Sequence, residues 1–196
     1  MPLTGKKMVI TGAAGGLGAG VARVAKRQGA EVVLLDVIDD FQSDLGQTYS
    51  VDLTDSDNVE ACFEAIGPFD IVANIAGGFD MGPEVHQTDD ALWDALFDIN
   101  VTTLRRVLSA ATPRLLANGG GRIINVGAVG ALKGGPKMGA YLASKSVVMR
   151  LTESLSEEVK GHGINVNAVL PSVINTARNR QDMPDADFSL WVDPED

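Results

Sequence analysis

The chain has 196 residues, 45% of them hydrophobic, which is enough to bury one core, and we expect a single domain over residues 1–196. A formal net charge of −10 argues against nucleic-acid partners, because phosphate backbones would be repelled. No stretch approaches the ~20 apolar residues of a membrane span, and the single cysteine, Cys62, fits a reducing compartment. We therefore expect a cytoplasmic protein with neither nucleic acid nor membrane as a partner.

Short apolar runs rich in β-branched residues alternate with longer helical stretches along the chain. Parallel strands need crossover connections, and a sheet covered by helices on both faces has near-continuous apolar strands. The pattern therefore predicts a doubly wound α/β fold. The predicted strands are Met8 to Thr11, Val32 to Asp36, Tyr49 to Val51, Ile71 to Ile75, Ile123 to Val126 and Ile164 to Leu170.

Capping residues mark the predicted helices. Thr88 can cap a long helix whose first turn is acidic, and Pro113 is expected to kink or restart that helix near its end. Glycines are expected to end the first and last helices. The predicted helices run from Leu17 to Gln28, from Thr88 through Leu92, Leu96, Leu104 and Leu108, and from about Tyr141 to Lys160, with Gly29 and Gly161 as the terminating glycines.

A glycine-rich turn, Thr11-Gly12-Ala13-Ala14-Gly15-Gly16-Leu17-Gly18, joins the first predicted strand to the first predicted helix. This arrangement aims unpaired backbone N–H groups and the positive end of the helix dipole at a pyrophosphate, and glycines let the backbone approach the phosphates. The spacing differs from G-x-G-x-x-G, so the turn alone indicates a dinucleotide site only moderately well.

Asp36 ends the second predicted strand, where a carboxylate can accept hydrogen bonds from the ribose hydroxyls of an adenosine. It would repel a 2′-phosphate, and no Lys or Arg occurs between Arg27 and Arg105 to offset that repulsion. We therefore predict that the cofactor is NAD(H) rather than NADP(H).

Tyr141 and Lys145 lie four residues apart, so on a helix they share one face and the ammonium can favour the phenolate. Together with a dinucleotide site, this pair predicts hydride transfer between the dinucleotide and a small-molecule substrate, with Tyr141 giving a proton to the substrate or taking one from it. The segment from Gly77 to Val85 follows the carboxyl end of a strand and is expected to line the pocket. His86 and His162 have no neighbours at metal-ligand spacing, so we expect no metal.

These residues together resemble the short-chain dehydrogenase/reductase family over nearly the whole chain. Thr11 to Gly18 is similar to its T-G-x-x-x-G-x-G turn, and Asn74 to Gly77 is similar to its N-N-A-G with one substitution. Tyr141-x-x-x-Lys145 resembles its catalytic pair. Pro171 to Thr176 resembles its P-G-x-x-x-T segment, with Ser172 in place of the glycine.

The resemblance implies a Rossmann-like, three-layer α/β/α fold and a catalytic set of Tyr141, Lys145 and Asn100. Tyr141 would be the general acid or base, Lys145 would lower its pKa and hold the nicotinamide ribose, and Asn100 would anchor a water linking Lys145 to solvent. A homodimer or homotetramer built on the long helices is also implied. The implied cofactor-binding residues are Gly12, Gly15, Gly16, Leu17, Gly18, Asp36, Asp52, Leu53, Asn74, Ala76, Gly77, Tyr141, Lys145, Pro171, Val173 and Thr176, with Asp52 at the adenine.

Ala128 departs from the family pattern, because members usually have a serine thirteen residues before the tyrosine to hydrogen-bond the reacting carbonyl. Losing such a donor typically costs 10²–10³ in rate. One interpretation is an electron-poor, quinonoid acceptor that needs little polarisation; dihydropteridine reductases, within the same family, also have alanine there and a similar tail. The alternative is a dinucleotide-binding protein with little or no activity. A nucleotide-sugar epimerase would use the same pair, but in a longer chain.

The family normally continues beyond the position of Asp196 into another helix and a final strand. If the chain ends here, we expect Ile164 to Leu170 to form an exposed edge of the sheet. The sequence is equally compatible with a fragment of a longer product.

Overall fold

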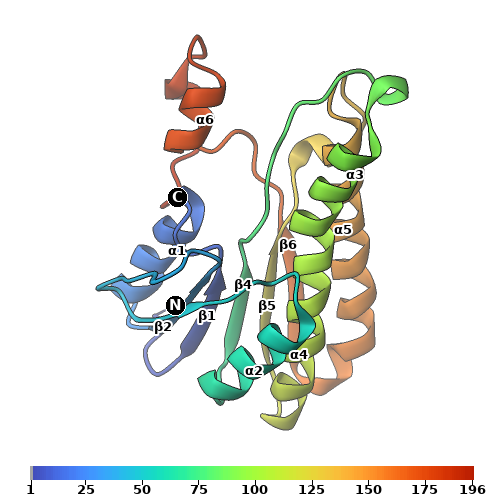
Figure 1. The fold of residues 1–196 in the computed structure, drawn as a ribbon. Helices are drawn as coiled ribbons and strands as arrows, with labels where there is room; N and C mark the ends of the chain where they lie inside the picture. Colours follow the sequence, from blue (N-terminus) through green and yellow to red (C-terminus); the bar gives the residue numbers. More distant parts are fainter. Residues whose placement is uncertain (1) are drawn as a thin grey trace.

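The computed structural model describes residues 2–196 and has a six-stranded parallel sheet at its centre (Figure 1). The strand order is β3-β2-β1-β4-β5-β6, so the connections run outward from β1 in one direction and then from β4 in the other. This is the order of a doubly wound sheet, and it confirms the predicted fold class. The strands are β1 (Lys7–Thr11), β2 (Glu31–Asp36), β3 (Gln47–Ser50), β4 (Ile71–Asn74), β5 (Gly121–Val126) and β6 (Ile164–Val169).

Helices cover both faces of the sheet and make three layers. Phe63, Val107 and Val159, from three different helices, belong to the core on one face, whereas Ala22 and Ala25 of the first helix pack with the alternate strand residues on the other. No helix within residues 2–196 has the length and apolar character to cross a bilayer. The helices are α1 (Gly16–Arg27), α2 (Ser56–Ile66), α3 (Asp90–Phe97), α4 (Thr103–Ala117), α5 (Gly139–Val159) and α6 (Ala177–Asp182).

The predicted long helix is in fact two helices joined by a π-helical turn, Asp98–Thr102. Its cap is Asp89, whose carboxylate accepts from the Leu92 N–H at 2.9 Å, and not Thr88, whose hydroxyl donates to the Glu84 carbonyl. Pro113 lies inside α4, which continues through it to Ala117. The helix is therefore interrupted at Asp98–Thr102, the turn that contains Asn100, and not at Pro113, where the sequence predicted a kink.

Residues after β6 return across the sheet to α1. The chain passes Ile174, forms α6 and returns, so that Val192 forms an isolated parallel bridge with Ile174. The Glu195 carboxylate forms ion pairs with Arg23 and Arg27 of α1, which brings the tail against the helix that follows the glycine turn (Figure 1). Within residues 2–196, β6 is an outer strand of the sheet, as expected.

Candidate active site

The candidate site lies at the carboxyl ends of the strands, beside the point between β1 and β4 where the strand order reverses. Open α/β sheets bind ligands at such points. Two cavities occupy this edge, one of about 710 Å³ over the glycine turn and one of about 570 Å³ around Tyr141. Leu17, Ile75 and Gly77 line both, so the two cavities form one continuous cleft.

The glycine turn is packed so closely that side chains would not fit at two positions. Gly12 has a φ of +62°, and a Cβ there would lie 2.8 Å from the Ala76 backbone N. A Cβ on Gly18 would lie 2.1 Å from the Gly12 carbonyl oxygen. The Thr11 hydroxyl accepts from the Ile75 and Ala76 N–H groups, which fastens the end of β1 to the segment after β4. These contacts fix the shape of the cleft floor.

The start of α1 opens into the larger cavity without a side-chain cap. Gly15 is the N-cap residue, so no side chain caps the first turn of the helix. Within residues 2–196, no protein acceptor is found for the backbone N–H groups of Gly16, Leu17 and Gly18, all of which line the cavity. Free N–H groups at a helix start, with the helix dipole behind them, favour an anion. The predicted pyrophosphate site therefore has the donors that it requires.

Two carboxylates lie at the other end of the larger cavity. Asp36 accepts from the Ala14 N–H at 2.9 Å through one oxygen and from the Val37 N–H at 2.9 Å through the other. A carboxylate has about four acceptor positions, so Asp36 retains capacity for ribose hydroxyls while it holds the turn. Asp52 accepts from the hydroxyl and the backbone N–H of Thr54, and these bonds lower the pKa of its carboxyl. Leu53 also lines this end.

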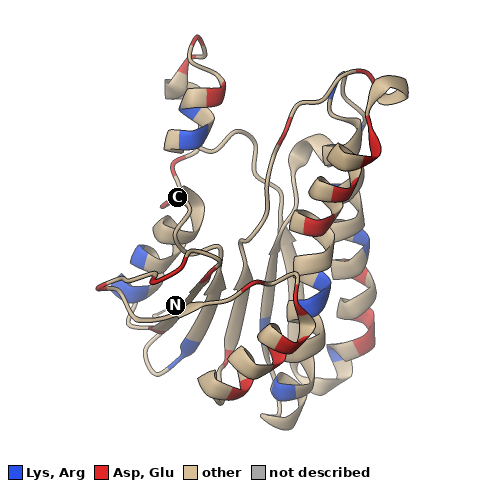
Figure 2. Ribbon diagram, in the orientation of Figure 1, with Lys and Arg blue, Asp and Glu red and all other residues tan. Residues whose placement is uncertain are grey.

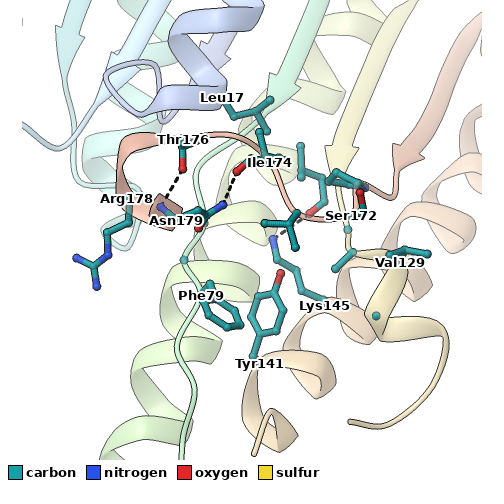
Figure 3. A pocket seen from close by; sticks show the side chains of 18 of the residues that line it. Leu17, Phe79, Val129, Tyr141, Lys145, Ser172, Ile174, Thr176, Arg178 and Asn179 are labelled. Atoms are coloured by element: carbon teal, nitrogen blue, oxygen red, sulfur yellow. Dashed lines mark hydrogen bonds between the residues drawn. The ribbon is translucent and has the colours of Figure 1, made fainter. Parts of the chain in front are cut away.

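Tyr141 and Lys145 lie on α5 and line the smaller cavity, where Figure 3 shows the phenol oxygen directed toward the ammonium. The Tyr141 ring meets Phe79 edge-on, with centroids 4.9 Å apart and an interplanar angle of 89°. Lys145 Nζ donates to the Val126 carbonyl at 3.0 Å. The pair thus has a fixed geometry, with one partner held by an aromatic ring and the other by the end of β5.

Burial sets the acid–base properties of this pair. Lys145 is only 6% exposed, and burial lowers its pKa to about 8. Burial also raises the pKa of Tyr141 above its ordinary value of 10. Both shifts favour the neutral forms, so burial opposes the lowering of the phenol's pKa that is expected from Lys145.

Asn100 lies in the π-helical turn and is 2% exposed. Its amide exchanges two hydrogen bonds with the Gly78 backbone, both 3.0 Å, and also donates to the Ser144 hydroxyl at 3.1 Å. A Cβ on Gly77 would lie 2.8 Å from Asn100 Oδ1 and 3.2 Å from Lys145 Nζ. The Asn100 side chain therefore braces the loop after β4 against α5, and this brace ends next to Lys145.

Asn74 is placed differently from the other predicted cofactor-binding residues. It is 5% exposed and lines neither cavity. Its side chain donates to Asn125 Oδ1 at 2.8 Å, and Asn125 in turn donates to the Thr152 hydroxyl at 2.8 Å. The structure thus gives Asn74 a buried role joining β4, β5 and α5, and not a place in the cleft. All other predicted cofactor-binding residues line one or both cavities.

The loops after β4, β5 and β6 supply the walls of the smaller cavity. The segment predicted to line it does so only as far as Met81, through Gly78, Phe79 and Met81, whereas no residue from Gly82 to Val85 lines the cavity. Ala128 lines it too, and offers a methyl group where the family pattern has a hydroxyl. Sequence reasoning missed the remaining apolar wall, because most of its residues lie in loops and short turns, and only Leu142 lies on a long helix, α5. These residues are Val129, Met138, Leu142, Ile174 and Met183.

The chain matches the family model described as short chain dehydrogenase over residues 6–187. A sorbitol dehydrogenase from Cereibacter sphaeroides is 34% identical over 187 residues, which cover 89% of this chain and 73% of that protein. A galactitol 2-dehydrogenase from Agrobacterium fabrum is 31% identical over 203 residues, covering 97% of this chain and 78% of that protein.

Solved structures have the same fold. The carveol dehydrogenase of Mycobacterium avium, crystallised in complex with NAD, superposes with a TM-score of 0.87 at 28% sequence identity. The superposition covers 99% of this chain and 88% of the carveol dehydrogenase. The chain therefore belongs to the short-chain dehydrogenase/reductase family, whose members are oxidoreductases that bind a nicotinamide dinucleotide.

Proposed function

We propose that this protein is an NAD(H)-dependent oxidoreductase that transfers hydride between the nicotinamide and a small carbonyl, alcohol or quinonoid compound. The observation that carries the proposal is the continuity of the cleft. Leu17, Ile75 and Gly77 connect the anion-binding start of α1 to the cavity that contains Tyr141 and Lys145.

The proposed chemistry assigns each reacting group to a position in the cleft. The bound cofactor supplies the hydride and, once oxidised, a positive ring that favours the phenolate. In the reducing direction, the substrate carbon gains the hydride, its oxygen gains the Tyr141 proton, and solvent returns a proton to Tyr141. Bringing a phenol from pKa 10 to near 7 requires about 4 kcal/mol, and the burial of Tyr141 adds to that demand. Lys145, when protonated, contributes in the same direction.

NAD(H) is proposed as the preferred cofactor because of the charges at the adenosine end. Asp36 and Asp52 line this cavity, and no Lys or Arg is among the described residues that line it. The ribbon of Figure 2 is coloured for acidic and not for basic residues along α2 and α3. A 2′-phosphate would therefore approach a carboxylate without a compensating cation.

The walls of the smaller cavity favour an apolar, conjugated substrate. Phe79, Met138 and Met183 are among the side chains around Tyr141, and Ala128 donates nothing. The sorbitol and galactitol dehydrogenases are named for polyols, whose hydroxyls would find partners only on the side of the cavity lined by polar residues such as Ser172 and Asn179 and not along the apolar side. A quinonoid ring or conjugated ketone needs fewer polar contacts and is already polarised. Quinonoid dihydropterins are one such class.

The test is NADH oxidation against quinonoid dihydropterins, quinones, conjugated ketones and polyol-derived ketoses. Tyr141→Phe should abolish turnover while the dissociation constant for NADH changes little, because the phenol acts on the substrate. Tyr49→Phe is the matched control, since Tyr49 is the only other tyrosine and lies on β3, outside both cavities. Wild-type rates in Tyr141→Phe would refute the mechanism.

The second candidate is a dinucleotide-binding protein with little activity, and Ala128 is the observation that favours it. In that case NADH binds tightly but no acceptor in the panel is reduced. The fixed geometry of Tyr141 against Phe79 argues for the enzyme, because a binding protein has no need of an oriented phenol.

A further inference from the structure

We propose that Ser172 supplies the hydrogen bond to the reacting oxygen that the alanine at position 128 cannot supply. The inference rests on the proposed function and deepens it by adding a catalytic residue. Ser172 and Ala128 line the same cavity as Tyr141. The sequence shows Ser172 in place of the family's glycine, so both departures from the pattern fall on the wall of one cavity.

Backbone pairing places Ser172 beside the Ala128 segment. Val126 and Val169 are the last ladder pair of β5 and β6. Beyond them, the Gly127 N–H donates to the Val169 carbonyl at 2.9 Å and the Val129 N–H donates to the Pro171 carbonyl at 3.1 Å. The two segments therefore remain paired as far as Pro171, and Ser172 follows directly. Figure 3 shows Ser172 and Val129 on the same side of the cavity.

The Ser172 hydroxyl is free to act on a substrate. Within residues 2–196 it makes no hydrogen bond to another protein group. Ser172 is not among the residues with a positive φ, so a side chain is accommodated where the family pattern has glycine. An exposed hydroxyl with no protein partner can turn toward an acceptor in the cavity at little cost.

The other donors of this cavity are engaged or lie elsewhere. Lys145 Nζ donates to the Val126 carbonyl, and the Asn179 amide donates to the Ile174 carbonyl at 2.8 Å. Arg178 pairs with Asp182 on α6. Thr176 lies against the glycine turn, since a Cβ on Gly16 would be 2.8 Å from its methyl carbon. Among the described residues that line this cavity, Ser172 therefore has, besides Tyr141, the only hydroxyl that no protein group engages.

The experiment compares Ser172→Ala with wild type using NADH and two acceptors, a quinone and an unconjugated ketone. We expect kcat for the ketone to fall about 10²-fold, as for loss of one oxyanion donor, and kcat for the quinone to fall less. The dissociation constant for NADH should not change. Adding Ala128→Ser to Ser172→Ala should recover at least about 10-fold of the ketone rate, because the family's own donor position is restored.

Ser156→Ala is the matched control, because Ser156 lies on α5 like Tyr141 but lines a separate hollow with Glu157 and Asn167. An active wild type with an unchanged Ser172→Ala rate on both acceptors overturns the role of Ser172 alone. An equal loss on both acceptors, together with weaker NADH binding, also overturns it, because that result indicates a cofactor contact. A wild type that binds NADH but reduces no acceptor overturns the proposed function and this role with it.

Discussion

Lys145→Met should stabilise the folded protein at neutral pH while it removes activity. Lys145 is 6% exposed, and its one protein hydrogen bond goes to the Val126 carbonyl. Burial without a carboxylate partner lowers its pKa from 10.5 to about 8. Burying the charged ammonium therefore lowers the free energy of unfolding at every pH at which Lys145 is protonated in the folded protein.

The cost and its sign follow from proton linkage. A shift of 2.5 pKa units at 1.36 kcal/mol each corresponds to about 3 kcal/mol. Below pH 8, Lys145 is charged in both states and the full cost is present. Between pH 8 and 10.5 the unfolded state binds more protons than the folded state, so wild-type stability rises with pH. Above 10.5 both states are neutral and the cost is gone.

Urea unfolding of wild type and Lys145→Met at pH 7, 8, 9 and 10 measures this effect. The stability advantage of the variant should shrink by about 2.5 kcal/mol between pH 7 and pH 10. The lost hydrogen bond lowers that advantage by about 1 kcal/mol at every pH. Lys160→Met controls for removing a surface ammonium, because its side chain is 67% exposed. If the free energy of unfolding changed with pH equally in wild type and Lys145→Met, the claim that burial of Lys145 costs stability would be refuted.

Two further substitutions test the cofactor end of the cleft. Asp36→Asn keeps one carbonyl acceptor for the turn but removes the charge. Because unit charges 4 Å apart interact by about 4 kcal/mol, the preference for NADH over NADPH, measured as a ratio of kcat/KM values, should fall by roughly 10²-fold or more. An unchanged preference would exclude Asp36 as its source. Gly18→Ala should lower the melting temperature and weaken NADH binding, because its Cβ would lie 2.1 Å from the Gly12 carbonyl oxygen and overpacking costs about 1–3 kcal/mol. Gly161→Ala, with no heavy atom within 4 Å, is the control, and equal behaviour of the two variants would contradict the packing argument.

Local chemistry made much of the fold predictable from sequence. All six strands were identified to within three residues at each end. Most of them carry an apolar, β-branched signal because they are buried between helices, whereas β3 is an edge strand with a weaker signal. The glycine turn was predictable for a similar reason, since a strand-to-helix turn of this shape excludes side chains at Gly12 and Gly18. Asp36 lies where its strand ends, so its position in the cleft followed from the strand.

Features that depend on tertiary contacts were not predictable. Asp89 and Thr88 are both good capping residues, and only the path of the preceding loop selects Asp89. The pairing of Asn74 with Asn125 joins residues 51 positions apart, so the pattern around Asn74 could not distinguish a sheet contact from a cofactor contact. The direction of the Tyr141 and Lys145 pKa shifts depends on burial, which spacing on a helix does not specify.

The π-helical turn at Asp98–Thr102 explains why periodicity failed where it did. An extra residue in a helical turn costs regular hydrogen bonds, and such turns persist where surrounding contacts compensate. Here the compensation is the paired bonds between the Asn100 amide and the Gly78 backbone, together with the bond to Ser144. Gly78 belongs to the loop that carries Phe79, and Ser144 precedes Lys145 on α5. The break in helix periodicity thus fixes the two segments that hold the reacting phenol and ammonium, and a helix continued regularly through Asn100 would leave both without that brace.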